Sequence, residues 1–96
     1  VNGTTNYVVK FTSPSTIGDT GSMIYDDGTR VGINTTSPNT SALIDITSTN
    51  KGFLGPRMTE TQRLNIVNPA TGLVVYQTDF DEGYYIYKSF GWVQII

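Results

Sequence analysis

The chain lacks the two side chains that carry much of the catalytic chemistry of proteins at neutral pH. Its 96 residues contain no histidine and no cysteine. The commonest general base and the strongest side-chain nucleophile are therefore missing, as are the thiolate ligands of structural zinc sites. Carboxylates are the remaining candidates for acid–base or metal chemistry. We expect no catalytic residues and no cofactor, and we expect that the protein is not an enzyme.

Two short acidic segments are the candidates for carboxylate chemistry. Asp79-Phe80-Asp81-Glu82 carries alternating oxygen ligands that could bind a hard cation, but it lacks the length and glycine placement of a calcium loop. Asp26-Asp27 directly precedes Gly28, which is typical of a hairpin turn. Neither segment forces two carboxylates to face each other across a cleft, as glycan hydrolysis would require. We interpret both segments as turns and predict no metal site.

Two arginines and a group of rings are the remaining candidates for binding. Arg57 and Arg63 could bind a ligand, but we favour ion pairs between subunits, with Glu60, Asp45 or Asp79 as partners. For the rings, packing is the favoured interpretation, because large rings are mostly used for burial. The alternative is that exposed rings stack on the faces of sugars. The rings in question are Tyr84, Tyr85, Tyr87, Phe90 and Trp92.

The composition restricts the class of protein and its partners. Apolar residues make up 38% of the chain and charged residues 15%, both below the usual share of compact domains. Six Tyr, four Phe and one Trp nevertheless argue against disorder, because a fold or an assembly must cover much of this ring surface. The net charge of −2 without a basic cluster predicts no nucleic-acid partner. No apolar run is long enough for membrane insertion.

Short apolar segments separated by turn residues predict a chain built mainly of strands. Thr59 and Gln62 have the spacing of a capping box, which predicts one short helix from Thr59 to about Val67 with Leu64 and Val67 facing inward. Asn68-Pro69 would end this helix. The strands after it predict a β-meander. Strands are expected at residues 7–11, 22–25, 30–33, 42–47, 73–78, 84–88 and 92–95.

The strand at residues 84–88 carries rings on both of its predicted faces. Tyr84 alternates with Tyr85, and Tyr87 follows on the second face. Two ring-bearing faces need two covers, and a chain of this length has few elements to supply both. We therefore expect that a neighbouring copy of the chain covers one face. The first residue is Val1 rather than Met, so we expect a fragment or a processed product of a longer protein.

The order of several motifs resembles the fibre proteins of phages and Bacteroidetes. Residues 3–11, Ile24-Tyr25-Asp26-Asp27-Gly28 and residues 31–38 resemble the repeat of long tail, head or surface fibres. Residues 51–59 with Gln62-Arg63, then residues 69–76 and Gly91-Trp92-Val93, resemble the GFLxPRMTxxQR-type module that often follows that repeat. Two departures are Asn34, where the repeat usually has Gly, and Gly55, where the module usually has Pro. The resemblance implies a trimeric fibre without a known active site in these modules.

These observations predict an all-β, elongated and intertwined homotrimeric fibre segment with one short helix and a C-terminal β-meander. We expect a shaft-like repeat at residues 1–50 and a knob-like module at residues 51–96. The predicted function is a structural module of a phage tail or head fibre, or of a surface appendage, that spaces and presents an attachment site. The alternative is a carbohydrate-binding tip. Expected partners are other copies of the chain, other virion or appendage proteins and a cell-surface glycan, in a virion or on a bacterial surface.

Overall fold

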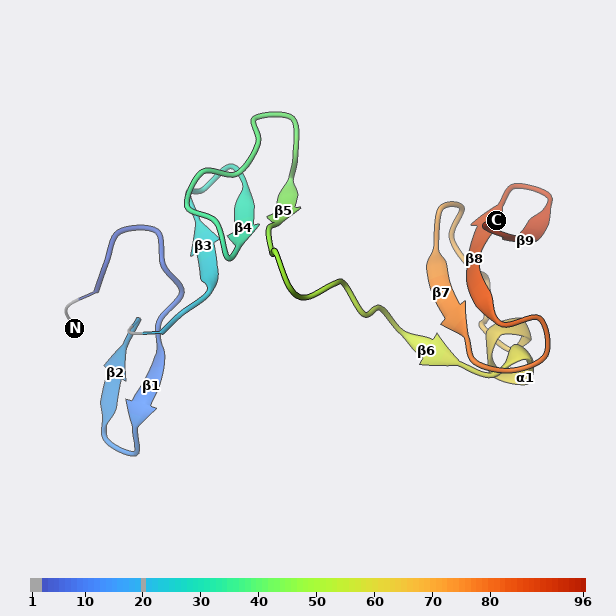
Figure 1. The fold of residues 1–96 in the computed structure, drawn as a ribbon, viewed down its shortest axis with the longest axis horizontal. Helices are drawn as coiled ribbons and strands as arrows, with labels where there is room; N and C mark the ends of the chain where they lie inside the picture. Colours follow the sequence, from blue (N-terminus) through green and yellow to red (C-terminus); the bar gives the residue numbers. More distant parts are fainter. Residues whose placement is uncertain (1–2, 20) are drawn as a thin grey trace. The chain divides into compact units, whose positions relative to one another are not determined.

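The computed structural model describes residues 3–19 and 21–96, and Figure 1 shows their course. The chain divides into two compact units, Val1–Lys51 and Gly52–Ile96. In the described residues, nine short strands and one helix make up the regular structure. The predicted all-β class with one short helix is therefore confirmed. None of the helices in the described part is long and apolar enough to cross a membrane.

The N-terminal unit contains two small sheets. Strand β1 (Lys10–Ser13) pairs antiparallel with β2 (Thr16–Gly18), and a second sheet has the order β3 (Ile24–Asp26), β4 (Val31–Ile33) and β5 (Ile44–Ile46). Strands β3 and β4 are antiparallel, whereas β4 and β5 are parallel. The strand predicted at residues 7–11 lies further along the chain, because its first residue forms only a single bridge, to Tyr25.

The predicted hairpin at Asp26-Asp27-Gly28-Thr29 connects β3 and β4. The Asp27 carboxylate accepts hydrogen bonds from the backbone N–H groups of Thr29 and Arg30, at 2.9 and 2.8 Å, and forms an ion pair with the Arg30 guanidinium at 3.1 Å. Gly28 has a φ of 89°, a conformation that suits glycine. The backbone N–H groups of Thr29 and Arg30 lower the pKa of Asp27 below its ordinary value, followed in effect by the Arg30 side chain.

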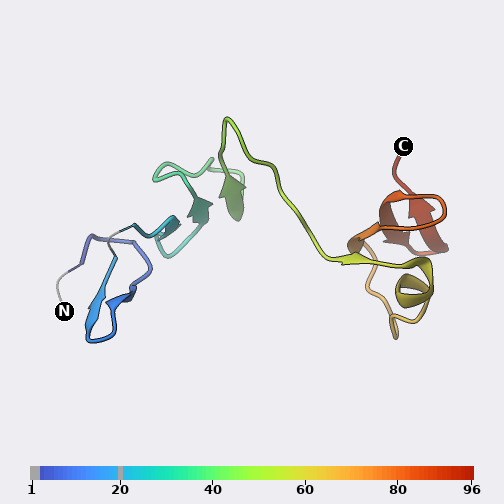
Figure 2. The same cartoon turned by 60° about the horizontal axis from the view of Figure 1, so that its bottom comes forward.

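The C-terminal unit is one four-stranded sheet with a helix beside it (Figure 2). The edge strand β6 (Arg57–Met58) lies parallel to β7 (Val74–Gln77). Strands β7, β8 (Gly83–Lys88) and β9 (Gly91–Gln94) then follow one another in antiparallel order. The predicted C-terminal β-meander is confirmed, and β6 extends it by one strand that the sequence did not indicate.

Helix α1 (Glu60–Leu64) begins where the capping box predicts and ends earlier than expected. The Thr59 side chain accepts a hydrogen bond from the Gln62 backbone N–H, and the Gln62 side chain accepts one from the Thr59 N–H. The prediction of Leu64 and Val67 as the inward face is wrong, because Leu64 is 60% and Val67 82% exposed. A five-residue helix has too few turns to form an apolar stripe, and Arg63 is its buried residue.

Candidate functional site

The face of the C-terminal sheet that meets α1, the helix-side face, carries the buried residues of this unit. Val75, Tyr85 and Gln94 lie opposite one another on β7, β8 and β9, and Tyr87 lies opposite Trp92. Residues paired in this way project on the same face of a sheet. Among the side chains that the structure describes, Val75 and Tyr85 are the buried hydrophobic ones. This face therefore holds the small core of the unit.

Arg63 of α1 completes the helix-side face. Its guanidinium carbon lies 4.1 Å from the centroid of the Tyr85 ring and 5.2 Å from that of Trp92. Its Nε donates a hydrogen bond of 2.7 Å to Oε1 of Gln77, which is 0% exposed. Gln77 in turn donates from Nε2 to the Asp79 carbonyl oxygen at 2.9 Å. Arg63 thus joins the helix to the sheet through contacts within one chain, which sequence reasoning did not anticipate.

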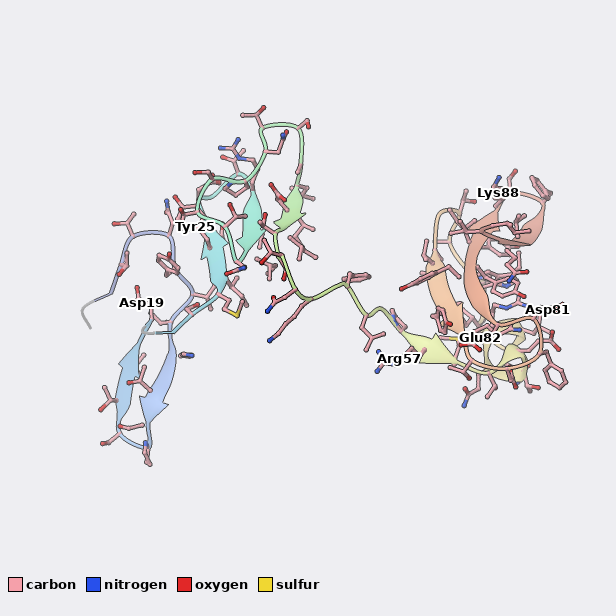
Figure 3. The ribbon with its side chains drawn as sticks, viewed as in Figure 1. Asp19, Tyr25, Arg57, Asp81, Glu82 and Lys88 are labelled. Atoms are coloured by element: carbon pink, nitrogen blue, oxygen red, sulfur yellow. The ribbon has the colours of Figure 1, made fainter. Side chains whose placement is uncertain are left out.

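Arg57 has a different environment from Arg63. Its side chain is exposed and its Nη1 donates a hydrogen bond of 3.3 Å to the Gly55 carbonyl oxygen. Figure 3 shows Arg57 on β6, at the edge of the C-terminal sheet. Neither arginine forms an ion pair within the described residues, where Arg30 and Asp27 make the single pair. The ion pairs between subunits that we predicted for Arg57 and Arg63 stay a prediction.

The opposite face of the C-terminal sheet, the open face, is apolar and is not covered by α1. Its side chains form two rows across the strands, with Ile86 at the centre of the first row and Tyr84 at the centre of the second. The second row extends past β9, where the backbone N–H of Ile95 donates to the Tyr84 carbonyl oxygen at 2.8 Å. The rows are Val74, Ile86 and Val93, and Tyr76, Tyr84 and Ile95.

Charged groups lie at the margins of the open face. Glu82 and Lys88 lie at opposite ends of β8, as Figure 3 shows. Arg57 lies beside Tyr76 at the β6 edge. The Tyr76 hydroxyl donates a hydrogen bond to the Glu82 carboxylate, and this bond is the main cause that raises the pKa of Tyr76 above its ordinary value. A tyrosine hydroxyl is ordinarily neutral at physiological pH, so Tyr76 places no charge at the centre of the face.

The five rings proposed as ligand-binding residues occupy three different places. Tyr85, Tyr87 and Trp92 lie on the helix-side face, where Tyr87 and Trp92 pack edge to face with centroids 5.2 Å apart. Tyr84 lies on the open face, 4.9 Å from the ring of Tyr76. Phe90 is 78% exposed in the turn between β8 and β9. The structure does not bring all five together on one surface, and their binding role stays a prediction.

The acidic segment at residues 79–82 is used for contacts within the C-terminal unit. Asp79 accepts a hydrogen bond from the Glu60 backbone N–H at 2.8 Å, next to the start of α1. The Asp81 carbonyl oxygen accepts a bond of 2.6 Å from the Tyr85 hydroxyl. Figure 3 shows Asp81 and Glu82 in the loop before β8. Within the described residues, there is no group of three or more acidic, His or Cys side chains that could hold a metal ion.

The N-terminal unit also has one covered and one uncovered sheet face. On one side, the loop at residues 35–39 folds over Gly32, and the Asn39 backbone N–H donates to the Asp45 carboxylate at 2.9 Å. The other side is aliphatic, and three of its residues, Ile24, Ile44 and Ile46, are exposed. The aliphatic face consists of Ile24, Val31, Ile33, Ile44 and Ile46, and Asp26 lies on the same side at the end of β3. A shallow hollow of about 380 Å³ lies elsewhere in this unit, beside Tyr7, Tyr25 and Asn34.

A comparison with protein families places the chain in a known family. Residues 32–96, which make up more than half of the sequence, match the model of the phage tail-like trimerisation region. The chain belongs to this family. The match begins in β4 and contains β5 and the entire sheet of the C-terminal unit. No curated protein and no solved structure matches the chain.

Membership in the phage tail-like trimerisation region family confirms part of the prediction from sequence. The chain is a structural module of a phage tail-like fibre, and the family supports self-association as a trimer. It also indicates a virion or a phage-related location. The family match does not test three finer predictions. These are the presentation of an attachment site, the glycan partner and the likeness to a Bacteroidetes fibre repeat.

Proposed function

We propose that the chain forms a homotrimer that serves as a spacer in a phage tail-like fibre and holds an attachment site away from the particle. Its partners are other copies of itself and neighbouring fibre or virion proteins. It performs no catalysis. The absence of His and Cys from the whole sequence supports this part of the proposal, because it removes the commonest general base and the strongest side-chain nucleophile. A surface appendage of a bacterium would use the same spacer in the same way.

The observation that carries the proposal is that each unit leaves one apolar sheet face uncovered. Large apolar side chains are exposed throughout the described residues, whereas Val75 and Tyr85 are the buried ones. Burial of apolar surface contributes roughly 25 cal/mol per Å², and a chain of this size has few other sources of stability. Contiguous apolar patches of this kind mark contacts with other proteins. Association of identical chains would cover these faces.

The proposed homotrimer gives a direct prediction for the purified chain. Light scattering coupled to size-exclusion chromatography is expected to give three times the chain mass of 10.5 kDa at micromolar concentration. The reason is that a monomer with the described burial would expose most of its apolar side chains. A well-folded monomer would contradict the proposal. A stable dimer would contradict the trimeric fibre and leave the argument from apolar surface intact.

Carbohydrate binding is a second candidate function, and the position of Phe90 favours it. This ring is 78% exposed at the turn between β8 and β9, next to the Tyr87 and Trp92 pair. Exposed rings stack well on sugar faces, which offer C–H groups to a π-system. In this arrangement Phe90 would touch the glycan, and Trp92 would hold the turn in place through its packing on Tyr87.

Two alanine variants separate ring packing from glycan binding. Trp92→Ala is expected to lower the free energy of unfolding by about 2–3 kcal/mol, because it removes a ring that packs on Tyr87 and Arg63. Phe90→Ala is expected to leave the melting temperature unchanged and to abolish binding on a glycan array if the turn is a recognition site. Melting and array binding are measured on both variants. A Trp92→Ala variant that melts like the wild type but has lost binding would contradict the packing role of Trp92.

A further inference from the structure

We infer that the open face of the C-terminal sheet is the surface on which three copies of the chain meet. The face consists of the rows Val74, Ile86 and Val93, and Tyr76, Tyr84 and Ile95. This inference rests on the proposed homotrimer and names the surface that forms it. The occupant of the face is therefore a second and a third copy of the same chain.

The two faces of the sheet differ in what already covers them. On the helix-side face, α1 places Arg63 over Tyr85 and Trp92, and Gln77 is fully buried. No element of the described C-terminal unit covers the open face in this way. On that face Val74 is 40% and Ile95 50% exposed. The whole sheet lies within the residues that match the trimerisation region. The uncovered face of this sheet is thus the apolar surface that the matched segment offers to another copy.

The distribution of charge fits contact between identical chains. Around a threefold axis, the same residue of each copy lies at the same height, so a charged residue near the axis would face two identical charges. The six residues of the two rows are uncharged. The charged residues lie at the margins of the face: Arg57 beside Tyr76 on the edge strand β6, Glu82 just before β8 and Lys88 at the end of β8. The Tyr76 hydroxyl donates a hydrogen bond to the Glu82 carboxylate at the margin of the face. Like charges would therefore be separated from the axis by the apolar rows.

Ile86 is the residue expected closest to the axis. It lies on β8, which has a neighbouring strand on each side, and it is paired with Val74 and Val93 in the first row. A trimer that closes on this face would bring three copies of Ile86 together. The aliphatic row would then form an interior layer, with the Tyr76 and Tyr84 rings as the next layer.

Substitution of Ile86 tests the position of the axis. Ile86→Asp would place three carboxylates together and is expected to reduce the mass measured by light scattering to that of one chain. Thr61→Asp is the matched control, since Thr61 is an exposed residue of α1 on the other side of the sheet, and it is expected to leave the trimer intact. Circular dichroism on both variants reports whether the strands persist. An Ile86→Asp variant that remains a trimer overturns the inference.

A cross-linking experiment avoids a disruptive charge and covers the case in which Ile86→Asp does not fold. The sequence contains no cysteine, so Val93→Cys and Thr61→Cys each introduce a single thiol. With a short trifunctional maleimide in dilute solution, Val93→Cys is expected to give a covalent species of three chains in at least about tenfold higher yield than Thr61→Cys, because proximity raises the effective concentration.

The outcomes distinguish the inference from the proposed function. Linkage at Val93→Cys but not at Thr61→Cys supports the open face as the interface. A chain that is trimeric by light scattering but links equally at both positions, only at Thr61→Cys or at neither overturns the inference and leaves the proposed trimer intact. A folded wild-type monomer overturns both.

Discussion

Replacement of Arg63 with alanine is expected to lower the free energy of unfolding by about 3 kcal/mol. The substitution removes the donor to Oε1 of Gln77, a side chain that is 0% exposed, and leaving a buried polar group unpaired costs about 1–3 kcal/mol. It also removes the guanidinium that lies 4.1 Å from the Tyr85 ring centroid, and such a cation–π contact contributes about 0.5–2 kcal/mol. The helix would lose the contacts that Arg63 makes with Gln77, Tyr85 and Trp92 of the sheet.

The measurement is unfolding in urea, monitored by the fluorescence of Trp92, the single tryptophan of the chain. The centroid of its ring lies 5.2 Å from the guanidinium carbon of Arg63. All variants are compared at one protein concentration, because the stability of an oligomer depends on it. Arg63→Met retains an apolar stem but removes both the hydrogen bond and the charge, so its difference from Arg63→Ala measures the packing of the stem. Thr61→Ala on the exposed side of α1 is the matched control and is expected to change stability little. An Arg63→Ala variant as stable as Thr61→Ala would show that Arg63 does not join helix and sheet.

The environment of Arg63 also shows what sequence reasoning can and cannot establish. The start of α1 was predictable because the capping box depends on Thr59 and Gln62, which are three residues apart. The inward face of the helix was not, because Leu64 and Val67 have the apolar character expected of a buried residue and are nevertheless exposed. Arginine is usually a surface residue, and no local pattern indicates that one will stack on rings from β8 and β9.

For strand pairing too, contacts between neighbours in sequence were predictable and contacts between distant residues were not. The β3–β4 and β8–β9 hairpins were predictable, since Gly28 and Gly91 mark their turns in the sequence. In the structure both glycines have positive φ values, 89° and 133°. The parallel pairs β4–β5 and β6–β7 were not, because no tight turn joins parallel strands and their partners are far apart in sequence. The two residues of β6 are also too few to show an alternating pattern.

The open face was predictable in outline. Alternation along β8 predicted rings on both faces, and the structure places Tyr84 on one and Tyr85 with Tyr87 on the other. The sequence did not indicate which face the helix covers, since that depends on the connection from α1 to β7 and on Arg63. The assignment of the uncovered side therefore required the structure, and the proposed interface depends on it.

A second large effect is expected at Gly32, where an added side chain has no space. A Cβ atom on Gly32 would lie 2.3 Å from the Thr35 carbonyl oxygen and 3.1 Å from Cγ of Pro38. Because the closest atom belongs to the backbone, the loop at residues 35–39 would have to move away from β4. Overpacking of this kind typically costs about 1–3 kcal/mol, and we expect Gly32→Ala to destabilise the N-terminal sheet by about 2 kcal/mol.

Hydrogen exchange measures this loss at the sheet itself. The backbone N–H of Val31 donates to the Leu43 carbonyl oxygen and that of Thr47 to the Ile33 carbonyl oxygen, so both report on the β4–β5 pair. Where exchange occurs by opening of this sheet, a loss of about 2 kcal/mol makes it about thirtyfold faster. Gly52→Ala is the matched control, since a Cβ there would meet no atom within 4 Å. Equal exchange rates in the two variants would show that the loop yields without cost, and that close approach of the loop to Gly32 does not stabilise the sheet.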